Sequence, residues 1–416
     1  MATIKPFRGL RPPTEIAAHL SCLPYDVMNS AEAAEKANDN DISLLHITHA
    51  EIDCPEGTDI HSNAVYQKAK DNFEEFQNEG LLIRDENAKF YIYAQGMDGR
   101  IQYGIVGLAS CEDYENGIIK KHELTRPDKE EDRMILTQWL DANIEPVFFS
   151  FKAVDEIDNL IARIVENQVP AYDFIADDGF LHQLWTIDSS DDNSLIEECF
   201  KNKIDSTYIA DGHHRTAAAA RIGLERKKQN PNHNGSESYN FFMAVHFPDN
   251  QLQIMDYNRV IKDLNGLSSE EFILELEASF YVEQMGKEIF KPSKLHEFSL
   301  YIDNYWYKLN AKEGTFSNDP IGVLDVTVLS NQVLEPILDI TDLRTSKRID
   351  FVGGIRGLGE LKRRVDSGEM KAAFALYPVS MQQLIDIADS GNIMPPKTTW
   401  FEPKLRSGLV INSIKD

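Results

Sequence analysis

Apolar residues recur every three or four positions in several stretches of the chain, and this spacing predicts helices. The clearest example is residues 63–80, where Val65, Ala69, Phe73 and Phe76 fall on one face. Shorter or weaker patterns of the same kind predict helices at residues 31–36, 156–168, 358–366 and 381–390. A further helix is expected to begin at residues 125–128, with Thr125 as its cap and Pro127 in its first turn.

Runs rich in β-branched and aromatic residues predict strands between these helices. Residues 90–94 and 101–108 flank a glycine-containing turn and predict a β-hairpin, and residues 298–309 predict another that turns at Asp303-Asn304. Residues 241–247 and 252–257 predict a third hairpin around residues 248–250, and residues 144–151 and 372–376 predict single strands. The fold class is therefore α/β, with helices and strands mixed, and three units are expected at residues 1–115, 116–260 and 261–416.

Composition excludes several classes of protein. The 416 residues carry a formal net charge of -26, whereas a protein that binds duplex DNA usually presents a basic face. No nucleic-acid partner is expected. No apolar run is long enough to cross a bilayer, and the first eleven residues lack the apolar segment of a secretory signal. The four cysteines are widely spaced, which is typical of reduced thiols in a cytoplasmic protein.

Residues 211–215, Asp-Gly-His-His-Arg, lie between a strand-like run at 206–210 and an alanine-rich helical stretch at 216–228. A strand that turns through glycine into a helix start presents free backbone N–H groups and the positive end of the helix dipole. Gly212 allows a ligand to approach the backbone, and His213, His214 and Arg215 add donors. This combination suits phosphate, although Asp211 as a simple helix cap explains the same residues equally well.

Two further segments carry more polar groups than a structural role requires. Lys121-His122-Glu123 stands before the helix that begins near Pro127, and a carboxylate at Glu123 could take a proton from a substrate hydroxyl. Pro396-Lys397-Thr398-Thr399 offers a cation and two hydroxyls to a phosphate or carboxylate. Taken singly, a solvated helix entry and an ordinary proline-rich connection explain these two segments better.

Together, the three segments resemble the ParB/sulfiredoxin superfamily, and within it the branch of free-serine kinases. That branch is similar in its Asp-Gly-His-His-Arg signature, in a His-Glu segment before it, and in a Pro-Lys-Thr-Thr segment near the C-terminus. The resemblance covers residues 117–257 and 348–404, while the first 115 residues have no counterpart in the small kinases. The whole chain also resembles an uncharacterised bacterial family, a domain of unknown function that shares the signature.

The resemblance implies a kinase that uses ATP or ADP with Mg²⁺ to phosphorylate a small-molecule hydroxyl, with free L-serine as the favoured acceptor. It implies Glu123 as the general base and Asp211 as the residue that orients the hydroxyl or the hydrated metal. Gly212, His213, His214 and Arg215 would hold the donor phosphates. Lys397, Thr398 and Thr399 would bind the substrate. The metal ligands are left open.

Other functions are excluded or kept open by particular residues. Sulfiredoxins need a cysteine where this chain has His213, so thiol chemistry is not expected. A nucleotide-binding regulatory switch without catalysis stays open, as does a kinase for homoserine, threonine or a sugar. Residues 24–27 and 46–51 could reshape the acceptor pocket; alternatively, His46 and His49 belong to a buried strand, since two histidines are weak evidence for a metal.

Overall fold

The computed structural model describes residues 1–415, and the chain divides into two compact units. The first unit comprises Met1–Leu252 and Pro403–Asp416, and the second comprises Gln253–Glu402. The sequence predicted three units instead. Strands from residues 1–115 lie in the same sheet as strands from residues 116–260, so residue 115 is not a boundary between compact units. The change of unit at residues 252–253 precedes the predicted boundary at residue 260, and Pro403–Asp416, which were predicted in the third unit, are grouped with the first.

A nine-stranded mixed sheet organises the described part of the first unit, in the order β6-β11-β8-β12-β5-β4-β10-β9, with β1 also paired to β5. Most neighbours are antiparallel, but β6 with β11 and β8 with β12 are parallel. The strands are β1 (Ile4–Lys5), β4 (Tyr91–Met97), β5 (Arg100–Ser110), β6 (Ile119–Lys120), β8 (Val147–Phe151), β9 (Tyr172–Ile175), β10 (Leu181–Thr186), β11 (Thr207–Asp211) and β12 (Phe241–Pro248). Short pairs join β2 (Leu10–Arg11) to β3 (Ile83–Arg84) and β7 (Ala142–Asn143) to β21 (Asn412–Ser413).

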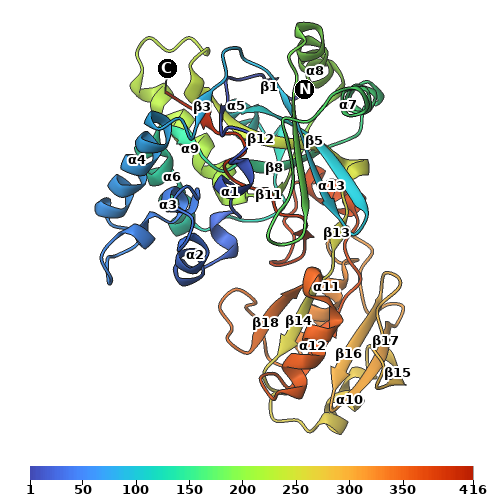
Figure 1. The fold of residues 1–416 in the computed structure, drawn as a ribbon. Helices are drawn as coiled ribbons and strands as arrows, with labels where there is room; N and C mark the ends of the chain where they lie inside the picture. Colours follow the sequence, from blue (N-terminus) through green and yellow to red (C-terminus); the bar gives the residue numbers. More distant parts are fainter. Residues whose placement is uncertain (416) are drawn as a thin grey trace. The chain divides into compact units, whose positions relative to one another are not determined.

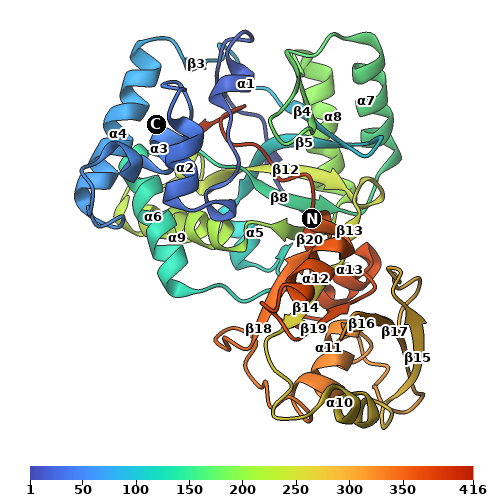
Figure 2. The same cartoon turned by 60° about the horizontal axis from the view of Figure 1, so that its bottom comes forward.

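Helices cover this sheet on two sides (Figure 1). On one side α7 (Asp155–Asn167) and α8 (Ser190–Lys203) bury an apolar cluster that includes Ile161, Phe200 and strand residue Phe151. On the other side lie α5 (Cys111–Glu115), α6 (Pro127–Leu140) and α9 (His213–Gln229), as Figure 2 also shows. The N-terminal helices are α1 (Ala17–Leu20), α2 (Ser30–Ala37), α3 (Leu45–Thr48) and α4 (Asn63–Asn78).

The second unit contains a six-stranded antiparallel sheet in the order β15-β17-β16-β19-β14-β18. Its strands are β14 (Tyr257–Ile261), β15 (Phe280–Gly286), β16 (Glu297–Ile302), β17 (Tyr305–Ala311), β18 (Ile349–Gly353) and β19 (Ala372–Ala375), and β13 (Ile254–Met255) pairs separately with β20 (Trp400–Phe401). The helices are α10 (Ser269–Leu276), α11 (Asp325–Leu329), α12 (Gly357–Asp366) and α13 (Met381–Asp389).

The mixed α/β class and most of the predicted elements are confirmed, including α2, α4, α7, α12 and α13 and the hairpins β4–β5 and β16–β17. The hairpin predicted at residues 241–257 is wrong, because β13 pairs with β20 and leaves β12 between β5 and β8. Thr125 does not cap α6: its hydroxyl donates to Glu130, while Pro127 does occupy the first turn. The segment with His46 and His49 forms helix α3 and the residues that follow it rather than a strand.

Candidate functional site

The turn between β11 and α9 has the geometry of an anion-binding helix start. β11 ends at Asp211, and Gly212 has a φ of 88° and acts as the N-cap of α9, so the cap is not Asp211. The first turn of a helix leaves its N–H groups without intrahelical acceptors. The left-handed backbone at this position favours glycine, and a Cβ atom on Gly212 would also crowd Arg215, lying 3.2 Å from its Nε.

Parallel pairing places a second predicted segment at the same edge of the sheet. β6 pairs with β11 through Ile119 with Thr207 and Lys120 with Tyr208, so the loops that follow both strands leave in the same direction. The rings of His122 and His213 meet edge to face with centroids 4.6 Å apart, and the backbone N–H of Arg126 donates to Nε2 of His214 over 3.0 Å. The half-buried Glu123 lies on this loop, directly after His122.

Arg215 is the buried cation of the turn. Its side chain donates to the carbonyl of Pro146 over 2.6 Å and to a carboxylate oxygen of Asp211 over 3.4 Å. Its Nε is also buried and has no hydrogen-bond partner within residues 1–415. Burial opposes the charge, but the carboxylates of Asp26, Glu145 and Asp211 hold the pKa of Arg215 above its ordinary value.

Burial lowers the pKa of all three histidines of the site, so they serve as neutral hydrogen-bonding groups at neutral pH. Burial lowers the pKa of His122 to about 4, against the opposing effect of Asp211. Burial also lowers the pKa of His213 well below its usual range, helped by His122 and His214, and it lowers the pKa of His214. Because Nε2 of His214 accepts a hydrogen bond, the ring proton of its neutral form is on Nδ1.

Sequence reasoning missed several groups around this turn. Nζ of Lys404 lies 3.8 Å from the carboxylate of Asp211, which gives the turn a second cation from the C-terminal end of the chain. Glu145 accepts the backbone N–H of Tyr25 over 2.8 Å, and the Tyr25 ring lies 3.8 Å from the Arg133 guanidinium. The sequence analysis selected residues 24–27 as a segment that could shape the acceptor pocket, but nothing in the sequence linked this segment to Glu145 or Arg133.

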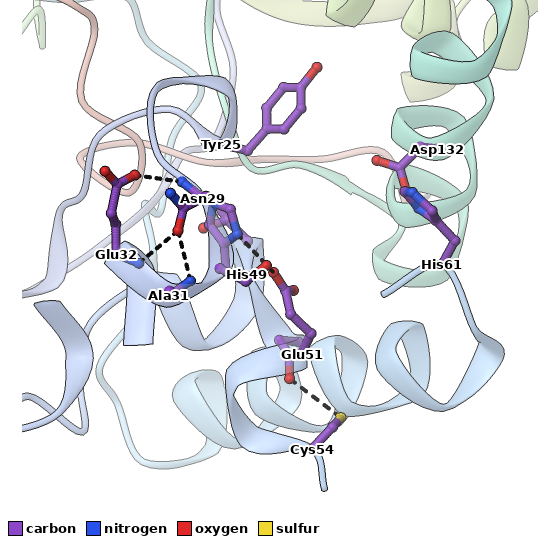
Figure 3. Close-up of polar contacts among 12 residues, drawn as sticks. Tyr25, Asn29, Ala31, Glu32, His49, Glu51, Cys54, His61 and Asp132 are labelled. Atoms are coloured by element: carbon purple, nitrogen blue, oxygen red, sulfur yellow. Dashed lines mark hydrogen bonds and ion pairs between the residues drawn. The ribbon is translucent and has the colours of Figure 1, made fainter. Parts of the chain in front are cut away.

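A chain of ion pairs supports the N-terminal side of the site. Arg133 pairs with Asp132 at 2.5 Å and with Glu145 at 3.7 Å, and His61 contacts Asp132 at 2.8 Å. Figure 3 shows His61 beside Asp132. A small cavity of about 40 Å³ lies among Arg133, Glu145 and Arg215, with room for ordered water.

The candidate histidines of the N-terminal unit are used by the fold. Nδ1 of His46 contacts Asp53 at 2.9 Å and its Nε2 contacts the carbonyl of Asn40 at 3.1 Å. His49 contacts Glu51 at 3.0 Å. Figure 3 marks this contact with a dashed line. Within the described residues no three His, Cys, Asp or Glu side chains are grouped so that they could hold a metal ion.

Lys397, Thr398 and Thr399 belong to the second unit and are described within it. Lys397 has a φ of 59°, and its carbonyl accepts from Arg259 over 2.9 Å. The hydroxyl of Thr398 donates to the carbonyl of Pro395 over 2.6 Å. The first unit therefore brings the signature together with the His122–Glu123 loop and Lys404, while the predicted substrate-binding residues lie outside that unit.

Other predictions concern the whole chain. Cys22, Cys111 and Cys199 are buried and Cys54 is half-buried, and none of the four forms a disulfide within residues 1–415. In the part of the chain that the structure describes, no helix has the length and apolar character needed to span a membrane.

The solved structures that match over most of the chain share little sequence with this protein. A conserved hypothetical protein from Pyrococcus furiosus is 15% identical over 73% of this chain and 94% of its own, with a TM-score of 0.36. A mutant free serine kinase in complex with AMP is 12% identical over 75% and 92%, with a TM-score of 0.35. SbnI with C-terminal truncation from Staphylococcus aureus is 10% identical over 74% and 87%, with a TM-score of 0.39. Scores this low support no inference about function.

A comparison with curated proteins finds no match. One family model covers most of the chain, however, from residue 4 to residue 327, and its description is "Protein of unknown function (DUF1015)". Because it spans well over half of the 416 residues, this protein belongs to the DUF1015 family.

Proposed function

We propose that the turn at residues 211–215 binds the terminal phosphates of ATP or ADP, and that the protein transfers a phosphoryl group to the hydroxyl of a small molecule, in the first instance free L-serine. The observation that carries this proposal is the junction of β11 and α9. A helix N-terminus, a left-handed glycine and a buried arginine meet there, and the arginine Nε has no acceptor among the described residues. Such donors suit a multiply charged anion.

Arg215 and the backbone N–H groups at the start of α9 would hold the phosphate oxygens. His214 would contribute a hydrogen bond rather than a charge, because its neutral ring carries the proton on Nδ1. Lys404 would balance the charge of Asp211 and of the nucleotide. This division explains why one buried arginine is kept charged while the histidines beside it are kept neutral.

Glu123 is the candidate general base. The acceptor hydroxyl oxygen would attack the terminal phosphorus, the bond from that phosphorus to the bridging oxygen would break, and the hydroxyl proton would pass to the Glu123 carboxylate. With ATP as the donor the nucleotide product would be ADP, and with ADP as the donor it would be AMP. Phosphoryl transfer asks the protein chiefly for positioning and charge neutralisation, which fits a site with few reactive groups.

Mg²⁺ fits the residues of the turn without a dedicated cluster, because it is commonly held by one or two carboxylates together with substrate phosphates. Asp211, which is 30% exposed, is the candidate carboxylate. Bound there, the ion would neutralise phosphate charge. Lys397, Thr398 and Thr399 remain the proposed residues for the acceptor, with Lys397 suited to a carboxylate and Thr399 to a hydrogen bond.

The test is product formation. Purified protein is incubated with Mg²⁺, ATP or ADP and a panel of hydroxyl amino acids and sugars, and phosphorylated products are identified by ³¹P NMR. Phosphoserine would support the full proposal, whereas another phosphorylated product would keep the kinase and change the acceptor. Nucleotide binding without product would favour a regulatory switch.

Glu123→Gln is expected to lower the rate of transfer by at least about 100-fold while leaving nucleotide affinity nearly unchanged, because a general base acts in the transition state. Glu131→Gln is the matched control, since Glu131 is an exposed carboxylate on the next helix. Full activity in Glu123→Gln would remove the assignment of the base.

A further inference from the structure

A cleft of about 320 Å³ lies in the first unit, between the N-terminal helices and the turn that joins β9 to β10. Its volume is within the range of small-ligand sites. One wall is apolar, with Leu23, Met28 and Leu45, and the rim carries Ile175, which is 71% exposed. The floor includes Arg406.

Two segments connect this cleft to the phosphate-binding turn. Residues 403–408 place Lys404 beside Asp211 and, two residues later, Arg406 in the cleft; two extended residues span at most about 7 Å. Residues 22–28 place Leu23 and Met28 in the cleft, while Tyr25 between them donates its N–H to Glu145 next to the turn. Backbone bonds between Cys22 and Ser407 join the two segments.

The charges of the cleft are already balanced. Arg406 is 6% exposed and donates to Asp177 over 2.6 Å and to Asp178 over 2.7 Å, and Lys36 also pairs with Asp177. The Nε of Arg406 is nevertheless buried without a hydrogen-bond partner among residues 1–415. A balanced cleft with apolar walls and an arginine donor suits a neutral, flat group with hydrogen-bonding edges better than a second phosphate.

We infer that this cleft binds the nucleoside portion of the nucleotide whose terminal phosphates occupy the turn at residues 211–215. The inference rests on the proposed function, because it assumes that the turn holds phosphates. It adds the reason for a nucleotide rather than a simple polyphosphate: the apolar walls and the Arg406 donor contact the base and sugar. It also gives the N-terminal residues 18–45 a role in recognising the donor.

Calorimetry with ADP and with inorganic tripolyphosphate separates the two parts of the ligand. Ala18 is exposed and lines the cleft, so Ala18→Trp fills the cleft from its rim with little effect on the core. This variant is expected to raise the Kd for ADP at least about tenfold while the Kd for tripolyphosphate stays within about twofold. Ala162→Trp, at an exposed position on α7, is the matched control and should change neither.

The remaining outcomes are distinct. Unchanged ADP binding in Ala18→Trp would overturn the inference, as would an equal loss in Ala162→Trp. Equal affinity of the unaltered protein for ADP and tripolyphosphate would also overturn it, since the nucleoside would then add no contacts, while leaving the phosphate-binding turn intact. Binding of neither ligand to the unaltered protein would overturn both the inference and the proposed function.

Discussion

Each unit contains a turn with a cationic side chain and a residue of positive φ, and the two turns use their polar groups differently. In the first unit Gly212 takes this conformation, a helix begins at the next residue, and Nε of Arg215 is left without an acceptor in the described chain. In the second unit Lys397 has the positive φ. The carbonyl of Lys397 accepts a hydrogen bond from Arg259, and the hydroxyl of Thr398 donates to the carbonyl of Pro395.

The sequence favoured anion binding for both turns, because residues 211–215 and 396–399 each combine a cationic side chain with neighbouring hydrogen-bond donors. What separates them is the state of those donors after folding. A donor that already has a partner gains little from a ligand, whereas a buried donor without one carries a cost that a ligand can remove. The turn in the first unit is therefore the stronger candidate for phosphate.

The largest expected difference between the two units is in their response to pH. Burial lowers the pKa of His122 in the first unit from 6.5 to about 4. The unfolded chain then binds a proton that the folded unit does not, so stability is lost as pH falls from 6.5 towards 4, by roughly 3 kcal/mol for this group. Buried His182 and His246 have lowered pKa values too, and act in the same direction.

The second unit should respond in the opposite direction through Asp325, whose pKa burial raises to about 7. Here the folded unit holds the proton, so stability is lost as pH rises from 3.8 to 7. Hydrogen exchange resolved by unit, at pH 4.5 and pH 7.5, should show the first unit weakened and the second strengthened in acid. Asp325→Asn should abolish the trend in the second unit, and its persistence there would contradict this account.

The next largest effect is expected on nucleotide binding. Arg215→Ala should weaken binding by about 1.5–3 kcal/mol, the value of a charge-assisted hydrogen bond. Because Arg215 is buried among carboxylates, Arg215→Lys is the safer companion: it keeps the charge and loses the Nε donor. Arg221→Ala, at a half-exposed arginine of the same helix, is the control for calorimetry. Equal affinities in all three variants would place the phosphates elsewhere.

A smaller effect is expected from the glycine of the turn. Gly212→Ala forces a side chain into left-handed backbone, at about 1–2 kcal/mol, and brings its Cβ against the Arg215 guanidinium. Gly235→Ala, at a φ of 91° with open space around it, carries the strain alone. Both variants should lower the temperature of thermal unfolding, whereas only Gly212→Ala should weaken nucleotide binding. A loss of affinity in Gly235→Ala would mean that backbone strain, and not the contact with Arg215, disturbs the site.

Elements set by local sequence could be predicted, and partners set by the tertiary fold could not. The β16–β17 hairpin was predicted from Asp303 and Asn304, residue types that favour tight turns. Both residues adopt positive φ values in the structure. The hairpin at residues 241–257 failed because the choice of partner for β13 depends on β20, which is about 145 residues later in the chain. The same limit applies to Thr125, whose hydroxyl donates to Glu130 instead of accepting from a backbone N–H group at the start of α6.

The site follows the same rule. The signature and the His122–Glu123 loop were found because both are contiguous motifs, and parallel pairing of β6 with β11 brings them together. The pKa values of the histidines could not be predicted, because they depend on burial by distant segments. Lys404 and Tyr25 reach the site from opposite ends of the chain, with no shared motif to link them.

The smallest expected effect tests the second turn directly. Thr398→Val removes a hydroxyl that donates within its own unit, so the second unit should lose about 1 kcal/mol of stability. Thr327→Val is the control, because the buried Thr327 hydroxyl has no partner among residues 1–415 and its removal should be neutral or stabilising. Nucleotide affinity, measured by calorimetry, should not change in either variant. A tenfold loss in Thr398→Val would show that the second turn also contacts the nucleotide, and the distinction between used and unused donors would then fail to separate the two turns.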